Sequence, residues 1–101
     1  MKIIQRNNEY RLVGRKFICS NSPRIYTLVG YAKKSQTGIN TVLLAYKPEG
    51  GYSNDLLRKS SFIEIMTMNG FKVSCLIDGY EDFLYDFYSQ YVFDNYFKEV
   101  E

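Results

Sequence analysis

The 101-residue chain contains no histidine and no tryptophan, and it has only two cysteines and two prolines. Without histidine the chain lacks the usual general base, the common nitrogen ligand for metals and the base of Ser-His or Cys-His nucleophile pairs. Cys19 and Cys75 are too few for a disulfide framework and too far apart in sequence for a metal-binding motif. We therefore expect no metal site, no cofactor and two buried free thiols.

Long apolar segments are also missing. No stretch approaches the roughly 18 residues that a membrane-spanning helix needs, and the first residues lack the apolar core of a signal peptide. Hydrophobic residues make up 46% and charged residues 24% of the chain, as in an ordinary globular protein. The sequence predicts a single domain, residues 1–101, located in the cytoplasm and without a membrane partner.

Charge and aromatic rings are divided unevenly along the chain. Residues 1–60 hold eleven Lys and Arg against three Asp and Glu, whereas residues 61–101 hold two against eight. Nine of the seventeen aromatic residues fall within residues 80–97. This polarity bears on solubility and partner choice rather than on the fold. It divides the expected domain into a basic, β-rich part, residues 1–77, and an acidic aromatic part, residues 78–101.

Turn residues between apolar runs predict strands in the first three quarters of the chain. The expected strands are residues 3–4, 10–13, 17–19, 25–31, 41–46, 62–68 and 71–77. The runs 25–31 and 41–46 should pair as a hairpin. A second hairpin, 62–68 with 71–77, is indicated by Asn69-Gly70, because both positions of such a turn favour a positive φ angle.

The last part of the chain predicts one C-terminal helix. Residues 80–97 contain no Pro or Gly. The apolar side chains at helical spacing are Phe83, Leu84, Phe87, Tyr88 and Tyr91. Asp78 is a suitable N-cap, because Glu81 follows three residues later as in a capping box. The expected fold is α+β, a small antiparallel sheet or barrel of five to six strands closed by this helix.

Five short motifs between Tyr26 and Gly70 occur in a recognisable order. They are YTLVGYA (26–32), SQT (35–37), VLLAY (42–46), GGY (50–52) and RKSSF (58–62). In this order they resemble a family of small bacterial SH3-like β-barrel domains of unknown function. Lys59 stands where the family pattern has a proline, and that pattern does not include the aromatic tail. The resemblance implies an SH3-like barrel and brings no activity with it.

The first functional interpretation is protein binding by the expected helix. Its predicted contact residues are Tyr85, Tyr88, Val92 and Tyr96. Tyrosine is enriched at the centres of protein interfaces, and an acidic helix crowded with rings has more of them than one buried face needs. The bias toward Ile, Lys, Asn, Tyr and Phe suits an AT-rich genome, such as that of a low-GC bacterium or its phage. We expect a small non-enzymatic regulatory protein, encoded by a phage, that captures a host protein or forms a homodimer.

The alternative interpretation is nucleic-acid binding through basic loops of the barrel. The predicted contact residues are Arg24, Lys33, Lys34, Arg58 and Lys59, all in or beside expected turns. Gathered on one face, they would contact phosphate groups. The sequence pI of about 8.5 is below that of dedicated nucleic-acid-binding domains, so the expected binding is weak and non-specific.

Catalysis is the third class, and no residue is predicted to be catalytic. Asp78, Glu81, Asp82 and Asp86 are the carboxylates that an acid–base reaction or a hard cation would use. Their spacing lacks the alternating ligands and the glycine of a calcium loop. We expect them on the solvated face of the helix.

Overall fold

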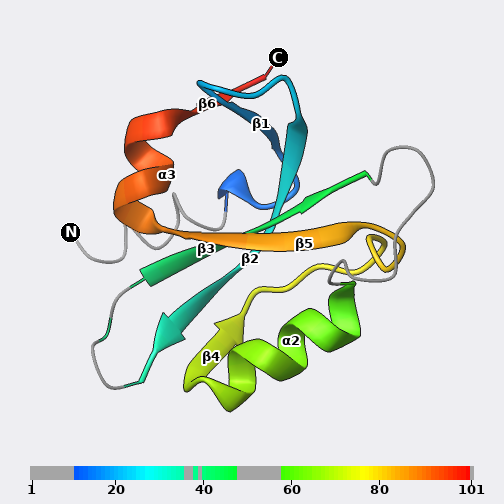
Figure 1. Cartoon of the computed structure of the whole chain (residues 1–101), viewed down its shortest axis with the longest axis vertical. Coiled ribbons are helices and arrows are strands. Elements are labelled where there is room, and N and C mark those ends of the chain that lie inside the picture. The colour runs from blue at the N-terminus through cyan, green and yellow to red at the C-terminus, as the bar shows by residue number, and fades with distance from the viewer. Residues whose placement is uncertain (1–10, 36–37, 39, 48–57, 101) are drawn as a thin grey trace.

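The computed structural model describes residues 11–35, 38, 40–47 and 58–100 of the chain. These residues form a six-stranded antiparallel sheet with helices packed on it, an α+β arrangement (Figure 1). The strands are β1 (Lys16–Cys19), β2 (Ile25–Lys34), β3 (Asn40–Tyr46), β4 (Phe71–Ser74), β5 (Leu84–Ser89) and β6 (Phe97–Glu99). The helices are α2 (Lys59–Met68) and α3 (Gln90–Tyr96).

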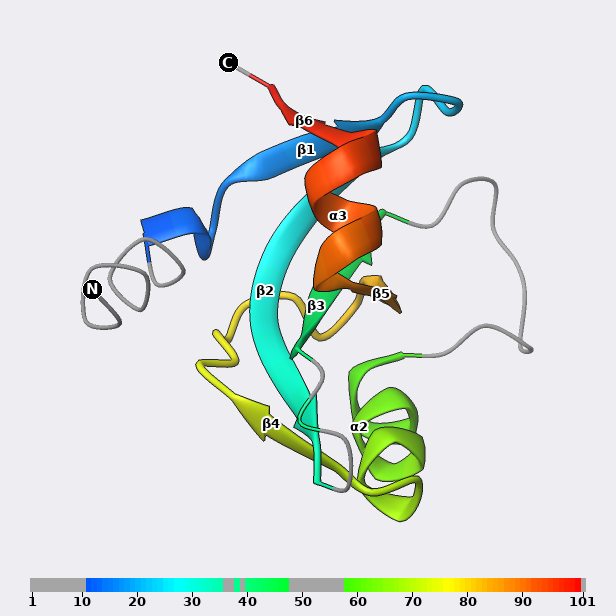
Figure 2. The same ribbon diagram turned by 90° about the vertical axis from the view of Figure 1, so that its left-hand side faces the viewer.

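The ten-residue strand β2 organises the sheet. The strand order is β5-β3-β2-β1-β6, and β4 also pairs with β2. One edge of β2 pairs with β3, while β1 and β4 share the other edge, β1 near Tyr26 and β4 near Lys33. Figure 2 shows β2 curving strongly between these two ends. The sheet is open, because the end strands β5 and β6 do not pair with each other, so the SH3-like barrel is not confirmed.

Strands β2 and β3 are buried along almost their whole length because both faces of the sheet are covered. On one face, α3 and β6 pack over a set of buried residues that we name the α3-side cluster. Its members are Phe17, Tyr26, Leu28, Tyr31, Val42, Leu44, Phe93 and Phe97. On the opposite face, α2 packs over the α2-side cluster. Its members are Val29, Ala32, Leu43, Ala45, Phe62, Met66 and Tyr85.

A β-bulge in β2 sets which side chains enter each cluster. The pairing with β3 shifts between Leu28 and Gly30, so one extra residue, Val29, is inserted. Gly30 is required there because the chain after β4 passes very close. A Cβ at Gly30 would lie 3.0 Å from the Cα of Leu76 and 3.2 Å from the carbonyl oxygen of Ser74.

The strand predictions for residues 17–19, 25–31 and 41–46 are confirmed, as is the hairpin that joins the last two. The prediction for residues 10–13 is wrong, because Arg11 and Leu12 are helical, and the expected strand 3–4 lies outside the described residues. Only the first half of the run 71–77 forms a strand, β4, and it pairs with β2.

The predicted second hairpin is wrong, because residues 62–68 belong to α2. Asn69 is the C-cap of this helix, and Gly70 follows with φ 87°, where its N–H donates to the carbonyl of Thr67. A glycine with positive φ commonly ends a helix. The motif residues 58–62 therefore hold the N-cap and the first residues of α2, and the motif 50–52 lies outside the described residues.

The predicted helix over residues 78–101 is also wrong in extent. This segment contains a loop, then β5, then α3 and finally β6. Asp78 does not cap a helix; the N-cap of α3 is Ser89, whose hydroxyl accepts the N–H of Val92 at 3.2 Å. The chain is extended on both sides of α3, because β5 pairs with β3 and β6 pairs with β1.

Candidate interaction surface

The four predicted protein-binding residues do not share one surface. Tyr85 is 4% exposed and lies in the α2-side cluster. Tyr88 points to the other face of β5 and packs half-buried against the α3-side cluster. On α3, Val92 is half-buried and Tyr96 is 49% exposed. The helical spacing that placed these side chains together does not apply, because Tyr85 and Tyr88 belong to a strand.

The acidic residues before β5 serve a local contact with α2, which we name the loop clasp. Lys59 Nζ lies 3.2 Å from Asp78 Oδ1 and 3.3 Å from Glu81 Oε2, and Arg58 donates to the carbonyl oxygen of Asp82. The hydrogen bond to Asp78 raises the pKa of Lys59. Backbone N–H groups, and then Lys59, lower the pKa of Glu81. Helix α3 itself contains one carboxylate, Asp94, and is not an acidic helix.

The five predicted nucleic-acid contacts are spread over three places. Arg24, before β2, stacks over the Tyr46 ring with 4.0 Å between its guanidinium carbon and the ring centre. Arg58 and Lys59 take part in the loop clasp. Lys33 and Lys34 lie at the opposite end of β2 from Arg24. The structure therefore brings together only Lys33 and Lys34 of this set.

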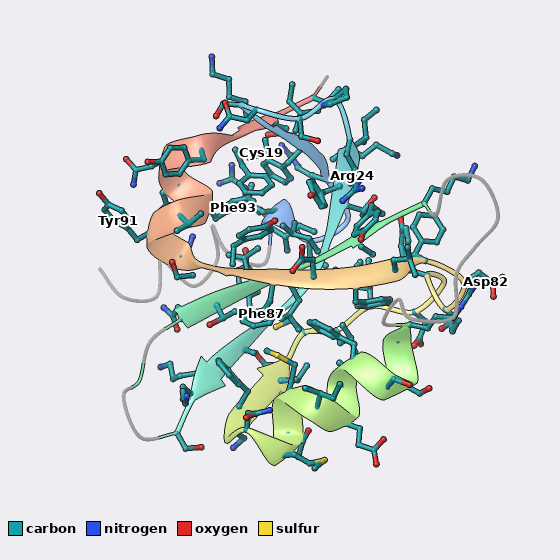
Figure 3. All side chains as sticks on the ribbon, in the orientation of Figure 1. Cys19, Arg24, Asp82, Phe87, Tyr91 and Phe93 are labelled. Atoms are coloured by element: carbon teal, nitrogen blue, oxygen red, sulfur yellow. The ribbon has the colours of Figure 1, made fainter. Side chains whose placement is uncertain are left out.

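Aromatic rings on the α2 side form a row that reaches solvent, which we name the aromatic row. The Phe87 ring lies 6.0 Å from that of Phe62 and 5.9 Å from that of Phe71. Phe62 is 1% exposed, whereas Phe87 is 43% exposed. Figure 3 shows Phe87 on the α2 side of β5. Lys34 Nζ lies 5.4 Å from the centre of the Phe71 ring and so continues the row.

A pocket of about 400 Å³ lies beside this row, between the end of β2 and the end of α2. It is lined by Lys34, Ser35, Met68, Asn69 and Gly70. The Ser35 N–H donates to the carbonyl oxygen of Gly70 at 2.9 Å and joins the two sides of the pocket. Met68 is 77% exposed, so its flexible side chain is free to adapt to what enters.

A third lysine completes this end of the molecule. Lys72 of β4 pairs directly with Lys33 of β2, and Lys34 pairs with Phe71. We name Lys33, Lys34 and Lys72 the lysine tip. None of the three forms a salt bridge with a residue that the structure describes. Like charges directly opposite each other in an antiparallel pair disfavour the pairing, so an anion bound at the tip would relieve this repulsion.

The described ranges contain no group of three or more Cys, Asp or Glu residues placed to hold a metal ion. Within the same ranges, no helix has the length and apolar character to cross a membrane. Cys19 and Cys75 are free thiols and are half-buried, so the expectation of full burial is wrong. The hydroxyl of Tyr85 is buried without a hydrogen-bond partner among the described groups, and burial raises its pKa.

The fold and this surface define a small α+β protein with an open antiparallel sheet and a row of rings that reaches the surface at Phe87, beside the lysine tip. No protein-family model matches the chain, and neither the curated proteins nor the solved structures contain a significant match. Sequence reasoning missed Phe87 and Lys72 as surface residues. The pairing of β4 with β2, about 40 residues away in sequence, places Lys72 in this surface.

Proposed function

We propose that the protein is a small non-enzymatic binding protein, and that the aromatic row and the lysine tip contact a protein partner. The observation that carries the proposal is Phe87, a ring that is 43% exposed although it lies between Phe71 and Phe62, which is 1% exposed. Ile65 and Met68 of α2 are also exposed, 43% and 77%. Exposed aromatic and methionine side chains are typical of protein interfaces.

The proposal retains protein binding as the function and moves the contact surface from α3 to the α2 side. Tyr85 is part of the core, and Val92 is half-buried, so neither offers a ring or branched side chain to a partner. Tyr91 and Tyr96 remain exposed on α3, but they lie about 140° apart around the helix axis. The phage origin and the cytoplasmic location stay predictions from composition.

Site-specific photo-crosslinking tests this function. A photoreactive phenylalanine analogue at position 87 should form a discrete cross-linked protein band in a nuclease-treated lysate, whereas the same analogue at position 91 should not. Position 91 is a matched control, because Tyr91 is an exposed aromatic residue outside the proposed surface. Equal cross-linking at both positions, or none at position 87, would contradict the proposal.

Nucleic-acid binding at the lysine tip is a second candidate function. It is supported by three lysines on paired strands that lack salt-bridge partners in the part of the chain that the structure describes. The Lys33→Glu/Lys72→Glu variant should then weaken binding to all sequences alike and reduce its dependence on salt. Gel-shift titrations at several salt concentrations measure both effects.

A further inference from the structure

Charge is separated along α2 of this protein. At the start of the helix, Lys59 forms ion pairs with Asp78 and Glu81, so its charge is compensated within the loop clasp. At the end of the helix stands the lysine tip, where three positive charges gather on paired strands. The carboxylate of α2, Glu64, lies one turn before Met68 and is exposed. Of the two ends of α2, the final one therefore offers the more favourable electrostatic interaction to a negatively charged partner.

The pocket adds an apolar element to this positive surface. It is a hollow of about 400 Å³ that is open to solvent on one side, so it offers room for one side chain of a partner. The Met68 side chain forms part of its wall, and Lys34 contributes both to the pocket and to the contact with Phe71. A partner that carries negative charges on both sides of one apolar side chain would match this arrangement.

We infer that the lysine tip and the adjacent pocket bind an acidic peptide segment of a partner protein, with one apolar side chain of that segment seated between Lys34 and Met68. This inference rests on the proposed function and specifies the chemistry of the partner. The carboxylates of the segment form salt bridges with Lys33 and Lys72. The apolar side chain extends the aromatic row beyond Phe71 and Phe87.

The ring geometry favours a peptide over a nucleic acid at this surface. Binding to single-stranded nucleic acid relies on open aromatic faces on which bases stack. Lys34 already lies over the ring of Phe71, and the Phe87 ring is packed against both Phe62 and Phe71. The exposed aliphatic side chains of Ile65 and Met68 lie on the same helix and suit contact with an apolar amino-acid side chain.

Fluorescence anisotropy with the full chain tests the inference. The probe is a labelled twelve-residue peptide with six Asp or Glu residues around a central Phe-Leu pair. Comparison probes are the same peptide with Lys in place of the acids, the acidic peptide with Ser in place of Phe-Leu, and a twelve-nucleotide single-stranded DNA. We expect the acidic Phe-Leu peptide to bind most tightly, with an affinity that falls as salt is added.

Charge variants locate the binding. Lys33→Glu/Lys72→Glu should weaken binding of the acidic peptide at least tenfold, and Met68→Ser should weaken this binding several-fold. The matched control is Lys16→Glu/Lys98→Glu, which makes the same charge change on exposed positions of β1 and β6, away from the tip. It should change affinity by less than twofold. Circular dichroism confirms that each variant is folded.

Three results would overturn the inference: no binding of the acidic peptide, equal weakening by the tip and control variants, or tighter binding of the DNA. The last result would support the nucleic-acid candidate instead. The test is separate from that of the proposed function. If cross-linking at position 87 succeeds and the acidic peptide does not bind, the binding function stands and the acidic chemistry of the partner is wrong.

Discussion

The two faces of the sheet carry aromatic clusters that end in different ways. On the α3 side, the Phe17 and Phe93 rings meet edge to face at 4.9 Å, and Phe97 stacks on Phe93 at 5.3 Å. These three rings are between 5% and 8% exposed. On the α2 side, the row runs from buried Phe62 through Phe87, which is 43% exposed, to half-buried Phe71.

The difference comes from the elements that cover each face. Helix α3 and strand β6 follow each other directly, and each contributes a ring, Phe93 and Phe97, to the α3-side cluster. Helix α2 places Phe62 and Met66 over the sheet but leaves the outer part of β5 uncovered. Similar rings therefore stabilise the fold where helices and strands enclose them, and they remain available for binding where the covering helix ends.

The largest expected effect is on the enclosed side. Phe93→Ala should lower the free energy of unfolding by about 3–5 kcal/mol, because it removes a buried ring and leaves a cavity. Tyr91→Ala on the same helix is the control and should change it by less than about 0.5 kcal/mol, since Tyr91 is 73% exposed. Urea unfolding measures both. Similar losses in the two variants would remove the distinction between enclosed and open rings.

Phe87→Ala should have an intermediate effect. Its ring contacts two neighbours but is 43% exposed, so we expect a loss of about 1–2 kcal/mol, the scale of one or two aromatic pairs. Phe62→Ala, at the buried end of the same row, should cost about 3–5 kcal/mol. The two variants, measured in parallel urea titrations, would break the comparison if Phe87 proved as costly as Phe62.

Two tyrosines of β5 extend the comparison to hydroxyl groups, because Tyr88 lies on the α3 side and Tyr85 on the α2 side. The Tyr88 hydroxyl donates to Asp86 Oδ2 at 3.2 Å, so Tyr88→Phe should cost about 1 kcal/mol. The buried Tyr85 hydroxyl has no partner among the described groups, so Tyr85→Phe should raise stability by up to about 1 kcal/mol. Thermal unfolding compares the two variants. A stability loss in Tyr85→Phe would show that its hydroxyl is hydrogen-bonded in solution.

The smallest expected effect is on the pH dependence of stability, and it appears only in alkaline solution. Burial raises the pKa of Tyr85, and burial, then the charge of Asp86 and a hydrogen bond with Tyr26, raise the pKa of Tyr88. In the unfolded chain these groups ionise near pH 10. The folded state then holds more protons, so stability is full below pH 10 and falls as pH rises above it. Unfolding titrations should show a shallower fall for Tyr85→Phe/Tyr88→Phe; an unchanged fall would exclude these two groups as its cause.

The sequence predicts best where local pattern and final environment agree. Residues 25–31 and 41–46 are rich in β-branched and apolar side chains, and they form a hairpin that is covered on both faces. The need for glycine beside the bulge at Val29 was not predictable, because it arises from the close passage of Leu76 past Gly30. Local propensity does not report a contact between segments so far apart.

The failures have equally specific causes. The apolar residues of 62–68 also fit helical spacing, and Asn69-Gly70 serves a helix end as well as it serves a hairpin turn. In β5, Tyr85 lies in the α2-side cluster and Phe87 contacts Phe62 on the same side, whereas Tyr88 packs against the α3-side cluster. Because apolar side chains point to both faces of β5, its sequence does not alternate between apolar and polar residues as that of a half-exposed strand does.

The candidate surface was predicted only in part. Lys33 and Lys34 were expected to contact a ligand, and both lie at the tip. Their neighbours Lys72 and Phe87 come from strands that join β2 and β3 over long sequence separations. Arg58 and Lys59 were expected on the same face as Lys33 and Lys34, but they contact the loop before β5 instead.

The pairing of β6 with β1 sets an order of events during synthesis. Strand β1 pairs with β2 on one edge and with β6 on the other, so residues 97–99 complete a pairing that begins at residues 17–19. Until those late residues leave the ribosome, β1 has a bare edge, and Phe17 lacks the rings of Phe93 and Phe97. The edge of β1 is thus open to pairing with other chains until residues 97–99 emerge, and this interval lengthens wherever translation pauses before Phe97.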